Sequence, residues 1–147
     1  MKLLAIIPIL ALIFSCCDRV CLVYGKTYHN YLNPFVDSKL GSRKIYSNDE
    51  LVMWELILPP GEASNLHTHH KNYIFYVQEG SKLDLFDRND KKIISFDCRK
   101  DSFFDMRKTE DGKEFVAKHD PTLRFPSCHW VKNVGNSQFK EFIVEHK

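Results

Sequence analysis

Residues 61–80 read GEASNLHTHHKNYIFYVQEG and contain three of the seven histidines of the chain. His67 and His69 are separated by one residue, so on an extended strand both imidazoles project from the same face. Neutral imidazole nitrogens are good ligands for zinc, iron or nickel, with a bond of about 2.0 to 2.1 Å for zinc. Two ligands alone make a weak site, so a third is expected from elsewhere in the chain.

The third ligand is expected from residues 125–133, which read FPSCHWVKN. A strand through this segment puts His129, Val131 and Asn133 on one face, and an antiparallel barrel can bring that strand beside the first histidine pair. Three histidines with open positions would hold a divalent ion, which is the arrangement that metal-assisted chemistry requires. The alternative is that the His-x-His pair is exposed and binds nothing.

The spacing of these residues resembles the first motif of the cupin superfamily, which is a Gly, five residues, His-x-His, a Glu and a final Gly. Gly61, His67, His69 and Gly80 fall at those spacings without a gap. The resemblance covers roughly residues 51 to 144. It implies an all-β fold, a single-domain cupin jelly-roll barrel with the site inside.

The second cupin motif ends in a His, three residues and an Asn, and His129 with Asn133 fits that ending. The Pro-x-Gly-x-x-His stretch that precedes it in the family is shortened here to residues 126–129, PSCH. More narrowly, Trp54 and the run from Phe142 to Glu145 look like a branch of small stand-alone cupins of poorly defined activity. Barrels of this family often dimerise, so the resemblance also implies a homodimer.

The chain departs from the family where the first motif has its Glu ligand, because Tyr73 stands there. A phenol with a pKa near 10 is a poor ligand for zinc or manganese at neutral pH. The site predicted from the resemblance is therefore His67, His69 and His129 alone. Tyr73 and Phe75 share the inward parity of their strand and Asn133 shares the face of His129, so all three are expected to line the pocket. Tyr73 is expected to fill the barrel, with its hydroxyl bonded to a neighbour. The alternative is that it is a metal ligand, because a ferric or cupric ion can hold a phenolate.

The remaining sequence predicts a mostly β domain without reference to any family. Short segments rich in Val, Ile, Phe and Tyr are bounded by turn residues, and seven or more strands at such spacing indicate a sandwich or barrel. No window after the first 25 residues has apolar positions at helical spacing, and there is no internal repeat. The expected strands are 51–58, 73–77, 82–86, 91–96, 114–117, 129–134 and 139–144. Residues 87–90 and the Asp111-Gly112 pair are expected to form tight turns.

Composition predicts one compact, folded domain. The 147 residues are 44% hydrophobic and 27% charged, which excludes disordered and low-complexity classes and allows a buried core. Lys and Arg number 21 against 19 Asp and Glu, and no basic run or stripe occurs, so nucleic acid is not an expected partner.

The first 25 residues predict export. Lys2 is followed by an apolar stretch from Leu3 to Phe14 and then small residues, which is the order of a secretory signal peptide. Twelve apolar residues are too few to cross a bilayer as a helix, so no stable membrane span is expected. Cleavage is expected near residues 15 to 25, and the alternatives are a lipid anchor through Cys16, an uncleaved anchor or a buried N-terminal helix.

After the leader, residues 26–43 read as an N-terminal arm and residues 44–147 as the barrel. If cleavage follows Gly25, the remaining cysteines are Cys98 and Cys128, which an oxidising compartment can pair. Whether these two cysteines meet is not decided by the sequence.

Three functions fit these observations. The first is a secreted metal-dependent enzyme of dioxygenase, isomerase or lyase type that holds Fe, Zn, Ni or Mn and acts on a small polar molecule. The second is a non-catalytic extracellular module that captures a small ligand or saccharide. The third is a surface or interaction protein that keeps the barrel for stability.

Overall fold

The computed structural model describes residues 39–147. The expected signal peptide, and residues 26–38 of the expected arm, lie outside the described residues. Leu40 is buried in the hydrophobic core, so the end of the arm packs against the barrel. Among the described residues, no helix has the length and apolar character that a membrane crossing requires.

The described chain is built of β-strands, and the all-β prediction is confirmed. The strands are β1 (Arg43–Ser47), β2 (Leu51–Leu58), β3 (His67–Thr68), β4 (Tyr73–Glu79), β5 (Ser81–Asp87), β6 (Lys92–Cys98), β7 (Phe103–Lys108), β8 (Glu114–Ala117), β9 (Asp120–Pro126), β10 (Cys128–Asn133) and β11 (Phe139–His146). All seven predicted strands are present within two residues of the expected bounds. The predictions missed β1, the short β3, β7 and β9.

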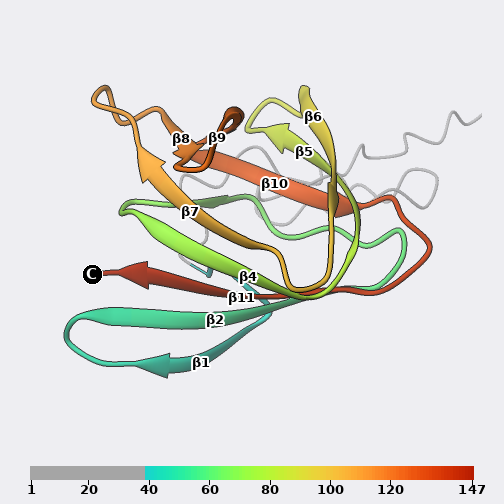
Figure 1. Ribbon diagram of the computed structural model, residues 1–147, viewed down its shortest axis with the longest axis horizontal. Coiled ribbons are helices and arrows are strands. Elements are labelled where there is room, and N and C mark those ends of the chain that lie inside the picture. Colours follow the sequence, from blue (N-terminus) through green and yellow to red (C-terminus); the bar gives the residue numbers. More distant parts are fainter. Residues whose placement is uncertain (1–38) are drawn as a thin grey trace, which may run out of the picture. The chain divides into compact units, whose positions relative to one another are not determined.

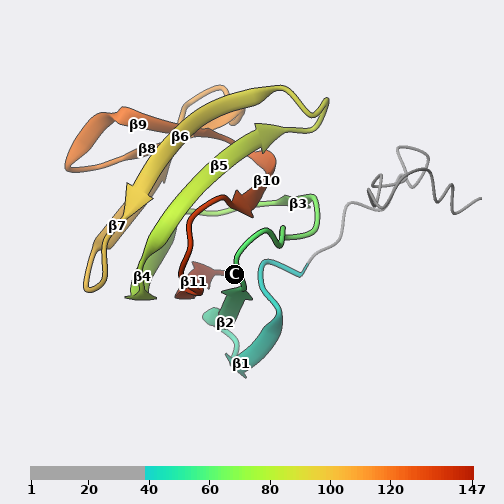
Figure 2. The same ribbon diagram turned by 90° about the vertical axis from the view of Figure 1, so that its right-hand side faces the viewer.

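The strands form two antiparallel sheets (Figures 1 and 2). The larger sheet has the order β1-β2-β11-β4-β7-β8-β9, and the smaller has the order β3-β10-β5-β6. Inward side chains alternate with outward ones along the central strands, as in β11, where positions 139, 141, 143 and 145 are buried. The core therefore lies between the sheets, and any residue that keeps this parity faces the interior.

Both predicted turns are found. In the hairpin between β5 and β6, Asp90 N donates to Asp87 O at 3.1 Å, and Asp90 adopts a φ of 61°. Asn and Asp tolerate this left-handed conformation better than most residues, which explains the composition of the turn. In the second turn Gly112 has a φ of 71° and donates to Thr109 O at 2.9 Å.

Two of the connections from the larger sheet to the smaller one are tight corners, β4 to β5 and β9 to β10. Gly80 joins β4 to β5, where a Cβ atom would lie 2.5 Å from Cys98 O, so only glycine fits. Ser127 joins β9 to β10; its N donates to Lys113 O at 2.8 Å and its O accepts from His69 N at 3.0 Å. The second corner therefore fixes the start of β10 against the segment that carries the first histidine pair.

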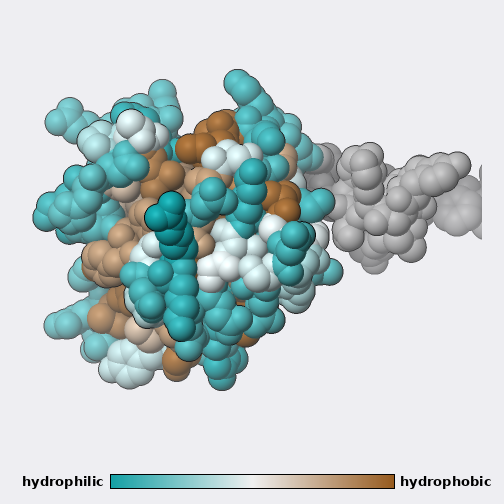
Figure 3. Space-filling view, turned by 45° about the vertical axis from the view of Figure 1, so that its right-hand side comes forward, coloured by the Kyte–Doolittle hydropathy of each residue, from teal (hydrophilic) through white to brown (hydrophobic). Residues whose placement is uncertain are grey.

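The surface of the barrel is mixed. Figure 3 shows a face that is largely hydrophilic, with separate hydrophobic patches between charged side chains. Cys98 and Cys128 are free thiols, Cys98 buried and Cys128 half-buried, so the structure contains no disulfide between them. Burial raises the pKa of the Cys98 thiol well above its ordinary value, as expected for an inert core cysteine.

Candidate metal centre

Two segments about sixty residues apart supply the predicted histidines. β3 pairs antiparallel with β10, and the register places His129 directly across from His67. His69 follows one residue after the end of β3 and is held by the hydrogen bond from its backbone N to Ser127 O. The exposed fractions are 3% for His67, 2% for His69 and 4% for His129, so all three imidazoles lie in the interior.

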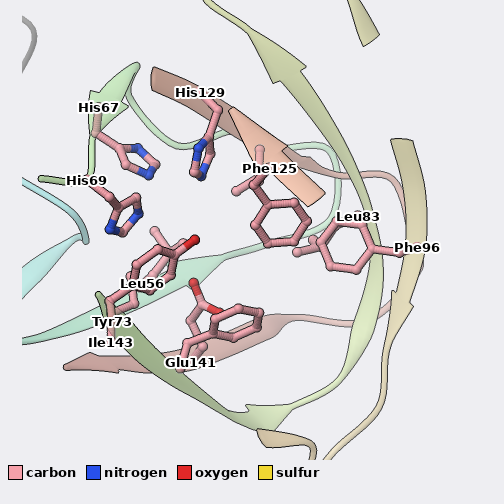
Figure 4. Close-up of a pocket in the computed structure, with 12 residues that line it drawn as sticks. Leu56, His67, His69, Tyr73, Leu83, Phe96, Phe125, His129, Glu141 and Ile143 are labelled. Atoms are coloured by element: carbon pink, nitrogen blue, oxygen red, sulfur yellow. The ribbon is translucent and has the colours of Figure 1, made fainter. Parts of the chain in front are cut away.

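The three rings converge on one another (Figure 4). Their centroids are 4.7 Å apart for His67 and His129, 5.1 Å for His67 and His69, and 5.3 Å for His69 and His129. One nitrogen from each ring lies within 4.8 Å of the others, and points so spaced fit within a circle of radius about 2.8 Å. An ion at the centre would need each nitrogen to approach by less than about 1 Å to reach the Zn–N distance of roughly 2.0 to 2.1 Å. The donor set therefore fits a transition metal ion.

Carbonyl oxygen atoms lie behind two of the three rings and select the nitrogen that faces the centre. His67 Nδ1 lies 2.9 Å from Asn65 O, and His129 Nδ1 lies 2.6 Å from Pro126 O. A carbonyl oxygen can only accept, so both Nδ1 atoms carry hydrogen and both Nε2 atoms keep a free electron pair. This is how protein metal sites commonly fix the tautomer of a histidine ligand.

His69 is oriented less tightly than the other two. Its Nδ1 lies 3.5 Å from Glu145 Oε1, which is ion-pair distance, but it makes no hydrogen bond within the described residues. Glu145 Oε1 is itself held by the backbone N atoms of His70 at 3.0 Å and Lys71 at 3.3 Å. Burial raises the pKa of Glu145, and these two donors and His70 lower it in part. Glu145 therefore lies where it can accept a hydrogen bond from His69 Nδ1 after a small rotation of the ring.

The charge state of the imidazoles suits metal binding. Burial lowers the pKa of His69 and of His129 well below the ordinary value, and neighbouring histidines lower both further. Because only a neutral imidazole has a free electron pair to donate, these two rings are in the ligand form at neutral pH.

The histidines open onto a cavity of about 30 Å³. A site of this volume has room for an ion with one or two waters, since a single water needs roughly 10 to 15 Å³ measured in this way. Tyr73 and Phe75 line the cavity, as expected, together with Phe96 and Phe125 from other strands. These rings fill most of the barrel and keep the space small.

Tyr73 occupies the position of the missing Glu and stacks on His69 with ring centroids 3.8 Å apart. Burial raises its pKa well above the ordinary value, and Glu141 and Glu145 raise it further. The hydroxyl is therefore protonated at neutral pH and is not a phenolate ligand. Its ring fills the barrel, as one of the two interpretations of the sequence held.

Asn133 does not line this cavity, contrary to the expectation from its place in the motif. Its side chain is fully buried, and its four hydrogen bonds join three backbone atoms and the side-chain hydroxyl of Ser81 in β5. Nδ2 donates to Leu58 O and Ser137 O at 2.8 Å, and Oδ1 accepts from Ser81 Oγ at 2.8 Å and Gly135 N at 3.0 Å. Asn133 lies four residues after His129, on the same face of β10, and has a structural role there.

Two acidic residues near the histidines were missed by the sequence analysis. Glu141 lines the cavity opposite the imidazoles, and Glu145 lies behind His69. The available signal was the alternation along the last predicted strand, which puts Glu141 on the same face as Phe139 and Ile143. His70, His119 and His146 are exposed, as expected for residues without a role in the site.

Comparison of the chain with protein-family models and with curated proteins finds no match. Solved structures do match. A cupin domain from Bordetella pertussis superposes with a TM-score of 0.51 at 16% identity, over 71% of this chain and 90% of that one.

Two further solved structures align less closely. A cupin 2 conserved barrel domain protein from Salinispora arenicola gives a TM-score of 0.45 at 16% identity, over 80% of this chain and 83% of that one. An RmlC-like cupin family protein from Methanocaldococcus jannaschii, described as a double-stranded β-helix, gives 0.46 at 11% identity, over 74% and 84%. At these sequence identities the similarity concerns the fold alone, and the assignment of the fold depends on the match to the Bordetella domain.

Proposed function

We propose that this chain, which has the cupin fold, binds a divalent transition metal ion through His67, His69 and His129 and acts as a metal-dependent enzyme on a small molecule. One observation carries the proposal: three buried imidazoles from separate segments converge within 4.8 Å. The carbonyl oxygens behind His67 and His129 turn a nitrogen with a free electron pair toward the centre. Three buried histidines without an ion would gain nothing from this convergence.

The donor set narrows the choice of metal. Imidazole suits iron, nickel and zinc, whereas manganese prefers carboxylate and water oxygens. Among the four metals expected from the sequence, manganese is therefore the poorest fit. A bound ion would supply Lewis-acid or oxygen-activating chemistry at this point.

The residues of the barrel define what can react there. The walls of the cavity are apolar apart from the three histidines, the Tyr73 hydroxyl and the Glu141 carboxyl. The hydroxyl of Tyr73 stays protonated and can donate a hydrogen bond to a ligand in the cavity. A volume of about 30 Å³ limits that ligand to a few atoms, or to the reacting end of a larger molecule.

Metal analysis of the purified protein tests the proposal. After exposure to iron, nickel or zinc salts, the wild-type chain and an exposed-histidine control, His119→Ala, should each hold about one equivalent. His129→Ala should hold much less, because it removes one of three ligands. Less than about a tenth of an equivalent in the wild type with every metal would refute the proposal.

A second function, ligand capture without chemistry, is favoured by one further observation. A groove of about 370 Å³ is lined by residues that include Lys39, Ser42, Glu62 and Asn65, and it reaches His67 of the candidate metal site. Its volume falls within the range of small-molecule sites, and its lining offers both charges and hydrogen bonds. A ligand of this groove should raise the melting temperature equally in the wild type and in His129→Ala, whereas a ligand of the metal should stabilise only the wild type.

We extend the proposal to export and to a homodimer, both expected from the sequence. Within residues 39–147 the larger sheet ends in β1, whose five residues are all exposed, so its outer edge can pair with a second copy. Sedimentation at twice the chain mass would support the dimer.

Export is tested by N-terminal sequencing of protein recovered from the medium. A sequence that begins after residue 15 or 25 would support export, and recovery of the protein only inside cells would refute it.

A further inference from the structure

Glu141 lies near the proposed metal site but is not one of its proposed ligands. It lies on the inward face of β11, is 8% exposed, and lines the same cavity as the three histidines. Figure 4 shows its carboxyl group pointing into the cavity from the side opposite His67 and His129. A ligand on the open side of an ion held by the imidazoles would therefore face this carboxyl group.

Glu141 differs from the other buried acidic residues of the described chain. Asp105 contacts Arg107 at 2.7 Å, and Glu55 contacts Arg43 at 2.9 Å and Lys140 at 3.1 Å. Glu145, described above, is held by two backbone donors. Each of these three carboxyl groups has a cation or a hydrogen-bond donor within reach.

Among residues 39–147, no such partner offsets the charge of Glu141. Burial alone raises its pKa to about 8, with no donor or cation acting against it. Apart from the histidines and Tyr73, the residues around the cavity are apolar, for example Leu83, Phe125 and Val131. A buried carboxylate without a partner costs several kcal/mol, so the empty barrel is a poor environment for this side chain.

A divalent ion among the histidines would offset the negative charge of the Glu141 carboxylate. Three neutral imidazoles add no charge to the ion. Glu141 is the one acidic side chain that faces both the ion position and the space in front of it, within the described residues. Its charge is then offset across a cavity wide enough for one or two waters.

We infer that Glu141 is the anionic partner of the metal site: its carboxylate accepts a hydrogen bond from the water or small ligand on the open side of the ion. The inference rests on the proposed metal site and specifies the ligand class. A small neutral ligand with an O–H or N–H group is favoured there, because it can donate to the carboxylate. A small anion is disfavoured, because it would face a carboxylate of like charge.

Glu141→Gln tests the inference, with the exposed Glu110→Gln as a matched control. Zinc affinity is measured by competition with a chelator, and azide affinity is measured from the visible spectrum of the cobalt(II)-substituted protein. Glu141→Gln should weaken zinc binding by about 10- to 100-fold, the usual effect of losing a partner around the ligands. It should also bind azide about tenfold more tightly, since azide no longer meets a carboxylate. Glu110→Gln should match the wild type in both measurements.

Zinc and azide affinities of Glu141→Gln within twofold of wild type would overturn the inference while leaving the three-histidine site in place. If the wild-type chain takes up no metal at all, the proposed function fails and the inference fails with it.

Folding of the variants is checked on the metal-free proteins at pH 8. Glu141→Gln and Glu141→Leu should both melt at a higher temperature than the metal-free wild type, because each removes a desolvated carboxyl group. Lower melting temperatures for both variants would mean that the carboxyl group is satisfied inside the empty barrel, which would also overturn the inference.

Discussion

Replacing Asn133 by alanine should be among the most destabilising single changes in the barrel. The side chain is fully buried and makes four hydrogen bonds, two donated and two accepted, which tie the end of β10 to Leu58 and to the turn before β11. A hydrogen bond contributes about 1 kcal/mol net, and its loss costs more where the partner stays buried. Asn133→Ala should therefore lower the free energy of unfolding by about 4 kcal/mol.

Urea denaturation followed by tryptophan fluorescence measures this change. The control is Asn136→Ala, since Asn136 is exposed and nearby, and its effect should stay within about 0.5 kcal/mol. Asn133→Asp adds a second check: at pH 7 its extra oxygen would face the carbonyl oxygens of Leu58 and Ser137, so it should be no more stable than the alanine variant. A loss below about 1 kcal/mol for Asn133→Ala would refute the structural role given to this residue.

Three further predictions concern pH and the corner of the barrel. The pKa of Glu141 is raised to about 8 in the folded protein, whereas it is near 4.5 in the unfolded chain, so the metal-free wild type loses stability as the pH rises from 4.5 to 8. Urea denaturation should show that the wild type loses about 2 to 3 kcal/mol relative to Glu141→Gln between pH 6 and 9. Parallel curves of unfolding free energy against pH for the two proteins would contradict this prediction. Because the pKa values of His69 and His129 are lowered in the folded protein, the stability that these residues contribute is present above about pH 6.5 and is lost as the pH falls below it. Equilibrium dialysis should show that bound zinc is released over the same pH range. Zinc that stays bound at pH 4 would argue against imidazole ligands. Gly80→Ala should cost at least about 1 to 3 kcal/mol, because the new Cβ would meet backbone atoms at 2.5 and 2.7 Å, and a melting temperature equal to that of wild type would count against this geometry.

Much of the barrel followed from local sequence patterns. The strands with clear alternation or long apolar runs, such as β2 and β8, were predicted with their observed bounds. β9 was missed because its sequence, DPTLRFP, holds two prolines and reads as a loop. It is the outer strand of the larger sheet, a position at which proline is tolerated because only one side of the strand has a neighbour. β1 was missed because all five of its residues are exposed, so burial imposes no periodicity on them.

The candidate site was predicted only in part for a related reason. Spacing identified His67, His69 and His129, because both motifs are local and the barrel brings them together by pairing β3 with β10. Glu141 carries no motif, and its place opposite the imidazoles depends on which strands are neighbours in the sheet. Asn133 and His129 lie on the same face of β10, because Asn133 comes four positions after His129. The alternation along a strand predicts the face of a residue but not its position along the barrel, and the cavity reaches His129 but not Asn133.

A crystal structure of the metal-loaded protein, with anomalous scattering recorded at the absorption edge of the metal, tests the central claim most directly. We expect one anomalous peak about 2.0 to 2.2 Å from Nε2 of His67, His69 and His129, with the Glu141 carboxylate across the cavity from it. Rings turned away from a common centre, or a metal bound only by exposed residues such as His119, would contradict it.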